Sequence, residues 1–460
     1  MFKFYALLAL LPIIFVFLKI NKREALNSLD ILLVFHSLYF AAIPLMGNEE
    51  LVRYQEVVKD GYVQFFAFAY YILFAIVLLI IDMYISKKGK GDGLLYLGDY
   101  IKTLSEKYNF TGKVAYVVML ISVVLITYSI VYFMTRTLSV SGMSFDEKFN
   151  AVQKSQTPLV IFFYGLTKTL RTFATFLIAI SYVQANRLNV SLGKKWHLVA
   201  FLLAFNYLLI NRTALFQGIT IIALVVYSVN RQTINAKTVM KILAILVLAI
   251  AIIFPLITAY RSTSKRLMGS AHSSVDVIIP SLLAVVNGEV DMQKADNKDS
   301  RSLGVFNIFA KSTNFDKNYN GELTLHSVSH GIPKYLYPGK SSDSSQSIIE
   351  GAIGNNVDVA DSILLHFQME NKHLGFLLSN LFFLFLIFIY DKMNNIFYQY
   401  THEEFLLIIF ISQLYPWLNQ IEYGFDAYTT GIFSAILLGV VCTFVMKFIR
   451  FLIYSFENKY

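Results

Sequence analysis

The sequence has little charge and almost no cysteine. Of its 460 residues only 15% are charged, whereas 56% are hydrophobic and 15% aromatic, and the mean hydropathy is +0.56. This composition lies well to the apolar side of soluble domains, in which about a quarter of the residues are charged. The single cysteine, Cys442, excludes an intrachain disulfide and a metal site built on thiolates.

Long runs of apolar residues recur along the whole chain. Each covers roughly 15 to 26 residues, and as an α-helix such a run is long enough to cross, or nearly cross, a hydrocarbon core of about 30 Å. We therefore predict an all-α polytopic membrane protein with about 11 transmembrane helices. The runs are residues 2–20, 29–46, 63–85, 114–134, 158–183, 197–211, 214–230, 242–260, 375–391, 404–421 and 428–447.

Positive charge is distributed unevenly between the two sets of segments that connect these runs. One set, which includes residues 19–28 and 86–113, holds 19 Lys and Arg residues, and the short segments of the opposite set hold 7. Because cytoplasmic loops carry the excess of Lys and Arg, this bias places the N-terminus outside and the C-terminus in the cytoplasm. No small-residue cleavage site precedes Lys19, so we expect the first run to be a retained helix. The net charge of +9 follows from these anchors and gives no argument for a nucleic-acid partner.

One connecting segment is much longer than the others, and this topology places it outside the cytoplasm. Residues 261–374 separate eight predicted helices in residues 1–260 from three predicted helices in residues 375–460. A loop far beyond about 15 residues is usually functional or disordered. The large extracytoplasmic loop is therefore the first place to look for binding or catalytic residues.

Three cations interrupt the predicted membrane region. Arg212 lies at a predicted hairpin turn, 211–213, at the outer surface and at the start of a helix, whose N-terminal end favours anions. Lys168 and Arg171 lie three residues apart on one helical face, about 15 to 20 Å from an outer end at Pro158. A charge at such depth costs about 2.5 to 3.5 kcal/mol, so these groups normally face a cavity or a partner.

No carboxylate interrupts the middle of any apolar run, so these cations indicate an anionic ligand that is carried in the lipid. Each cation also has a structural alternative. Arg212 can reach lipid phosphates from the membrane surface. Lys168 and Arg171 can bind backbone carbonyls or pair with Glu422 or Asp426.

The large extracytoplasmic loop also contains cations that could bind an anionic ligand. Arg261 and Arg266 follow the eighth run directly, and arginine binds phosphate through two parallel hydrogen bonds. The Pro, Gly, His and aromatic residues of 323–340 favour an ordered surface, and we expect short helices at 344–353 and 358–370 on the membrane face. Lipid headgroups and the membrane interface are the alternative contacts for these cations and aromatic rings. The candidate glycan-binding residues, in which rings adjoin cations, are Lys334, Tyr335, Tyr337 and Lys340.

Three local patterns carry a resemblance to a known family. They are "NRTALFQG" at 211–218, "IPKYLYPGK" at 332–340 and "ADSILLHFQMENKHLGFLL" at 360–378. Together with the topology over most of the chain, they resemble the Wzy-type oligosaccharide repeat-unit polymerases, which make O-antigen and related polysaccharides and are akin to O-antigen ligases. The resemblance implies a GT-C-like architecture in the bacterial cytoplasmic (inner) membrane.

The reaction that this resemblance implies moves a growing glycan from undecaprenyl pyrophosphate to a sugar hydroxyl of an incoming lipid-linked repeat unit. Cations must stabilise the charge on the leaving pyrophosphate, and a base should accept the proton of the acceptor hydroxyl. The candidate cations are Lys168, Arg171, Arg212, Arg261 and Arg266. The candidate bases are His326, His330, Asp361 and His366.

Fixed cations take the place of a divalent ion in this interpretation, so we expect a metal-independent glycosyltransferase without a cofactor. The nearest approach to an Asp-x-Asp pair, Glu289-Val-Asp291, is better explained by a solvated polar loop. The expected partners are the undecaprenyl-pyrophosphate-linked oligosaccharide, the lipid bilayer and a chain-length regulator of the polymer.

Two other functions remain open. An O-antigen ligase uses the same chemistry with a lipid A core sugar as acceptor, and sequence physics does not separate the two acceptors. A transporter or flippase for an anionic lipid-linked sugar would line its path with the intramembrane cations. Transporters usually show internal repeats and broken helices in matching halves, and this sequence shows neither.

Overall fold

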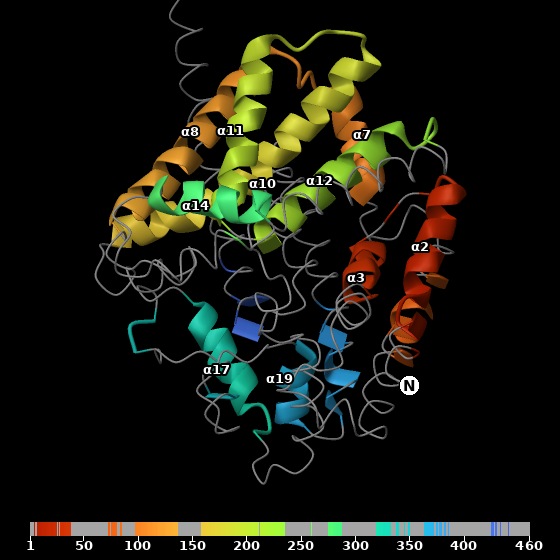
Figure 1. Ribbon diagram of the computed structural model, residues 1–460. Helices are drawn as coiled ribbons and strands as arrows, with labels where there is room; N and C mark the ends of the chain where they lie inside the picture. Colours follow the sequence, from red (N-terminus) through yellow and green to blue (C-terminus); the bar gives the residue numbers. More distant parts are fainter. Residues whose placement is uncertain are drawn as a thin grey trace, which may run out of the picture. The chain divides into compact units, whose positions relative to one another are not determined.

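The computed structural model describes the chain in separate segments, and every regular element in them is a helix (Figure 1). The chain forms two compact units, unit 1 with residues 1–20, 26–97 and 299–460, and unit 2 with residues 21–25 and 98–298. The described segments are residues 7–24, 28–37, 97–136, 158–210, 212–234, 275–287, 319–332 and 363–371, with single positions or short stretches at 4, 26, 72–73, 75–80, 83–84, 259, 337–339, 345, 348–349, 374–375, 377–379, 381–382, 385, 425–426, 428–429, 433 and 440.

Unit 2 is built on four helices that pack against one another. α10 lies against α8 and α12, and α11 lies against all three of these helices (Figure 1). The helices of this part of the chain are α7 (Leu97–Lys107), α8 (Lys113–Arg136), α10 (Pro158–Arg187), α11 (Lys194–Ile210), α12 (Arg212–Asn230) and α14 (Val275–Val286).

α10 is a helix of 30 residues and begins at Pro158, as the sequence predicts. Proline is tolerated in the first turn because its missing N–H would have no partner there. Beyond the last turn, Asn189 adopts a left-handed φ of 51°, a conformation typical of helix ends. Phe173, Leu177 and Ile180 are buried at helical spacing, so they form the face that packs against the neighbouring helices.

The buried side chain of Gln184 ties the connection between α7 and α8 to α10. Its Oε1 accepts a hydrogen bond from the backbone N–H of Phe110 at 2.7 Å. Its Nε2 donates to the carbonyls of Ser105 at 2.8 Å and Tyr108 at 2.6 Å. Backbone groups at the end of α7 and in the connection that follows are satisfied in this way, which holds this connection beside α10.

α11 and α12 form the predicted hairpin. α11 ends at Ile210 and α12 begins at Arg212, so a single residue separates them. A Cβ atom placed on Gly218 of α12 would lie 2.9 Å from Cζ of Tyr207 of α11. In one continuous helix these two positions would be about 16 Å apart, so α12 folds back against α11. The predicted break at 211–213 is therefore confirmed.

Unit 1 contains α2 (Leu11–Asn21), α3 (Ser28–Ser37), α17 (Glu322–Gly331) and α19 (Ile363–Glu370). Lys19 Nζ lies 2.8 Å from Asp30 Oδ1, and both side chains are buried. α17 packs against α19, and a small apolar core joins them. The members of this core are Tyr319, Leu323, Ile349, Leu365 and Met369.

Where the predicted apolar runs fall on described residues, the chain is helical except at Ala9 and Leu10, which form a turn. α8, α10, α11 and α12 cover four of the runs, and the predicted short helix at 358–370 is confirmed over 363–370. The runs at 242–260, 404–421 and 428–447 lie outside the described residues apart from isolated positions. Within the described part of the chain, no helix has both the length and the apolar character that a membrane span requires.

α14 forms in a part of the outer loop for which the sequence predicts no helix. Ten of its 12 residues are apolar, the exceptions being Asp276 and Ser281, and Pro280 lies inside the helix. The residues that follow it are polar, so the loop as a whole has low average hydropathy. This average obscures the short apolar helix in the sequence. Its exposed large side chains follow helical spacing and are Ile279, Leu282, Leu283 and Val286.

Candidate functional site

Two of the predicted bases, His326 and His330, lie one turn apart on α17. Their ring centroids are 6.4 Å apart with an interplanar angle of 25°, and both side chains are half-buried. Residues four apart lie on the same helical face, so the structure brings these two histidines together. Asp361 lies outside the described residues.

His366 of α19 is fully buried. Its Nε2 lies 3.2 Å from Oγ1 of Thr324 and 3.8 Å from Oε1 of Glu370. Its ring stacks on Phe425, with centroids 4.8 Å apart and an interplanar angle of 19°. Burial lowers the pKa of His366 to about 3, although the nearby charge of Asp426 acts in the opposite direction. The imidazole is therefore neutral at physiological pH and acts as a hydrogen-bonding group.

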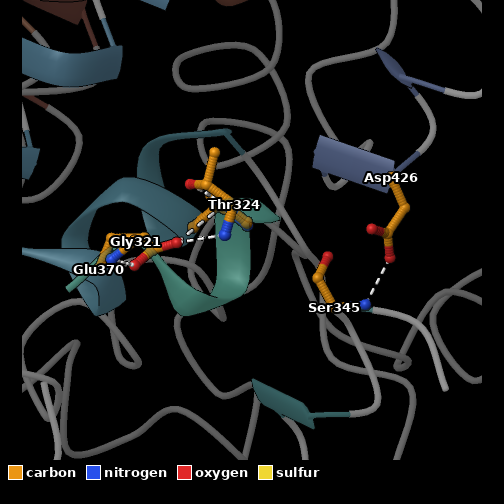
Figure 2. A network of polar contacts seen from close by, with 6 residues as sticks. Gly321, Thr324, Ser345, Glu370 and Asp426 are labelled. Atoms are coloured by element: carbon orange, nitrogen blue, oxygen red, sulfur yellow. Dashed lines mark hydrogen bonds and ion pairs between the residues drawn. The ribbon is translucent and has the colours of Figure 1, made fainter. Parts of the chain in front are cut away.

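Glu370 caps the first turn of α17 from another helix (Figure 2). The N-cap residue Gly321 has a left-handed φ of 96° and no side chain that could accept a hydrogen bond. The buried carboxylate of Glu370 accepts hydrogen bonds from the backbone N–H groups of Gly321 and Thr324 instead. This contact satisfies donors that a helix start leaves open and fixes α17 against α19.

Sequence reasoning missed Glu370. The available signal was a carboxylate at the end of an otherwise apolar segment, "ILLHFQME", four residues after a histidine. That spacing places Glu370 and His366 on one helical face. The partner on α17 lies 46 to 49 residues earlier in the chain, so the capping role itself had no local signal.

Asp426 is a second carboxylate of this region that the sequence analysis did not propose as a base. Its Oδ2 accepts a hydrogen bond from the backbone N–H of Ser345 (Figure 2). Its Oδ1 is buried and has no hydrogen-bond partner in the described part of the chain, and the same holds for His366 Nδ1. Thr429 fixes the neighbouring backbone, since its Oγ1 donates to the carbonyl of Ser327 at 2.9 Å.

Among the predicted cations, Arg171 is the one whose side chain the structure describes. It lies on α10, is only 6% exposed, and its guanidinium carbon is 5.4 Å from the ring centroid of Tyr207. Its Nε has no hydrogen-bond partner among the described residues, and the described carboxylates form no ion pair with it. At 1.5 Å per residue, Arg171 lies about 20 Å from the start of α10 at Pro158.

Tyr207 is a contact of Arg171 that sequence reasoning missed. Its hydroxyl lies 2.6 Å from Oγ1 of Thr175, which itself donates to the carbonyl of Arg171 at 2.8 Å. Gly218 of α12 allows the close approach, because any side chain there would collide with the Tyr207 ring. Three helices therefore hold one tyrosine against the buried guanidinium.

The other predicted binding residues are placed only in part. Lys168 lies on α10 one turn before Arg171, and Arg212 is the first residue of α12. Tyr337 is exposed. The remaining candidates lie outside the described residues and are Arg261, Arg266, Lys334, Tyr335 and Lys340.

The donor atoms of the described residues form no metal-binding group of three or more His, Cys, Asp or Glu side chains. What the described residues offer is a buried guanidinium in unit 2 and a carboxylate–imidazole cluster in unit 1. Comparison of the whole chain with protein-family models, curated proteins and solved structures gave no match.

Proposed function

We propose that this protein is a multi-pass membrane glycosyltransferase that polymerises lipid-linked oligosaccharide repeat units. The observation that carries the proposal is the buried Arg171, which has an open Nε and no described carboxylate partner inside a group of apolar helices. A buried cation without a carboxylate partner is costly, so this site favours an anion that arrives from outside the chain. The pyrophosphate of a lipid-linked glycan supplies such an anion within the membrane.

The outer faces of unit 2 support a lipid environment. Val117, Ile121, Val124 and Tyr128 are exposed along one face of α8, at spacings of three and four residues. The opposite face of α8 is buried against its neighbours, so the helix is apolar on both sides. Soluble proteins rarely expose continuous apolar stripes of this kind, whereas lipid chains cover them without cost.

Two further helices show the same pattern. Leu198, Phe201 and Phe205 form an exposed apolar stripe on α11. α14 exposes apolar side chains at helical spacing within the predicted outer loop, which suits a helix that lies on the membrane surface.

In the proposed reaction, a sugar hydroxyl of the incoming repeat unit attacks the anomeric carbon of the growing chain. The bond from that carbon to the pyrophosphate oxygen breaks, and polyprenyl pyrophosphate leaves with the electron pair. Arg171, with Lys168 and Arg212 as further candidates, stabilises the charge that develops on the leaving group. The hydroxyl proton passes to a base of unit 1.

The test is a product assay with purified protein in lipid nanodiscs and a lipid-linked repeat unit as substrate. A polymerase yields a ladder of longer glycans that remain attached to polyprenyl pyrophosphate. Glycan transferred to an added lipid A core would identify a ligase instead. In proteoliposomes, unchanged substrate that has crossed the bilayer would identify a transporter.

A further inference from the structure

Asp426 is held in place through one carboxylate oxygen and left open at the other. The hydrogen bond from the Ser345 N–H fixes Oδ2, and Figure 2 shows the Asp426 side chain turned toward Ser345. Oδ1 is buried without a donor among the described residues. A buried carboxylate oxygen that lacks a hydrogen bond is unfavourable, so a group that brings a donor to Oδ1 gains binding energy.

Two more unfilled polar atoms lie in the same region of unit 1. His366 Nδ1 and Ser345 Oγ are both buried and have no partner among the described residues. His366 lies within electrostatic range of Asp426, and Ser345 touches it directly. Asp426 itself is only half-buried, which places it at the solvent edge of this cluster.

The chemistry of these atoms selects a hydroxyl group as the missing partner. The carboxylate oxygen is an acceptor only, whereas a neutral imidazole can donate from Nδ1 and a serine hydroxyl can do either. An alcohol fits both requirements because it donates to Oδ1 and accepts from Nδ1. A phosphate would be repelled by the carboxylate.

We infer that Asp426, His366 and Ser345 form the binding site for the acceptor sugar hydroxyl, and that Asp426 is the base that removes its proton. This inference rests on the proposed function. The acceptor O–H bond breaks and its proton moves to Oδ1 of Asp426, while the oxygen forms the new bond to the anomeric carbon. Polyprenyl pyrophosphate leaves with the electrons of the old bond, so atoms and charge balance.

The decisive variant is Asp426→Asn, measured as the initial rate of polymer formation from the lipid-linked repeat unit. Asparagine keeps the size of the side chain and an oxygen that can accept from the Ser345 N–H, but it cannot take a proton. We expect a rate loss of about 100- to 10,000-fold with an unchanged melting temperature. Glu322→Gln is the matched control, because Glu322 is an exposed carboxylate on α17, and its rate should equal that of the wild type.

Ser345→Ala tests the same site with a second variant, in case the Asp426→Asn variant folds poorly. It removes the open hydroxyl and keeps the backbone N–H that holds Asp426, so the apparent KM for the repeat unit should rise several-fold with kcat nearly unchanged. A full rate in Asp426→Asn, or an unchanged KM in Ser345→Ala, overturns the inference and leaves the proposed function standing. A wild-type protein that forms no polymer overturns both.

Discussion

At the scale of single residues, the side chains that matter most are polar groups in apolar surroundings. Arg171 and His366 are both more than nine-tenths buried, yet the structure gives them different roles. Arg171 has an Nε without a hydrogen-bond partner among the described residues, whereas His366 is neutral and contacts Thr324 through Nε2. Burial therefore suits the arginine for binding an anion and the histidine for orienting a hydrogen-bond network.

Gly218→Ala tests whether Tyr207 positions Arg171. The added methyl group would lie 2.9 Å from Cζ of Tyr207, so the ring must move, and the guanidinium in contact with it moves as well. We expect polymerisation to fall by about 10- to 100-fold, since small displacements of a catalytic group are costly. Gly193→Ala is the control, because nothing lies within 4 Å of the added methyl group there. Equal rates in the two variants would show that Tyr207 has no positioning role.

The low pKa of His366 predicts that the free energy of unfolding decreases in acid. Its folded pKa of about 3 lies below the unfolded value of 6.5, so between these values the unfolded chain binds one more proton than the folded chain. The contribution of His366 to the free energy of unfolding is complete above pH 6.5 and falls by about 1.4 kcal/mol per pH unit as the pH drops toward 3. Unfolding measured at several pH values should show a shallower acid decline for His366→Asn than for wild type. Parallel curves would contradict a buried neutral histidine.

At the scale of elements, helix ends show which features the sequence could predict. α10 begins at Pro158 and the hairpin breaks before Arg212 because these signals are local: a proline that suits a first turn, and a polar interruption between apolar runs. The start of α17 has no such signal. Its N-cap is a glycine, and its capping carboxylate comes from α19.

The candidate site also combines residues that a local sequence signal identifies with residues whose role depends on the fold. The sequence singled out Arg171 because a cation in an apolar run is visible without a fold. It could not separate buried His366 from half-buried His326, since burial depends on the packing of α17 against α19. Asp426 could not be recognised either, because its partner Ser345 lies 81 residues away in the chain.

Glu370→Ala tests the cap between α19 and α17. Removal of the carboxylate leaves two N–H groups of the first turn of α17 without their acceptor, which should cost about 1 to 3 kcal/mol of local stability. Hydrogen exchange of the α17 amides should accelerate accordingly. Glu322→Gln, which alters an exposed carboxylate in the same first turn, should change exchange by a few tenths of a kcal/mol at most. Similar exchange in both variants would rule out the capping role of Glu370.

At the scale of the whole molecule, the proposed reaction needs its acceptor site on the side of the membrane where lipid-linked glycans are assembled into polymer. The distribution of Lys and Arg predicts that residues 261–374 lie on that side. α17, with His326 and His330, and α19, with His366, both fall within this range. Ser345, which binds the proposed base Asp426, also falls within this range. The predicted topology and the location of the acceptor site therefore depend on each other, and one labelling experiment tests them together.

Ser302→Cys, in a chain whose single cysteine Cys442 is replaced by serine, reports the side on which the loop lies. A membrane-impermeant maleimide should label this variant in intact spheroplasts, because the charge distribution places residue 302 outside the cytoplasm. Ser191→Cys is the matched control: it lies in the connection between α10 and α11, which the same distribution places in the cytoplasm, so it should react only after lysis. Labelling of Ser302→Cys only after lysis would reverse the topology. It would also remove the cluster around His366 from the compartment in which the proposed transfer takes place.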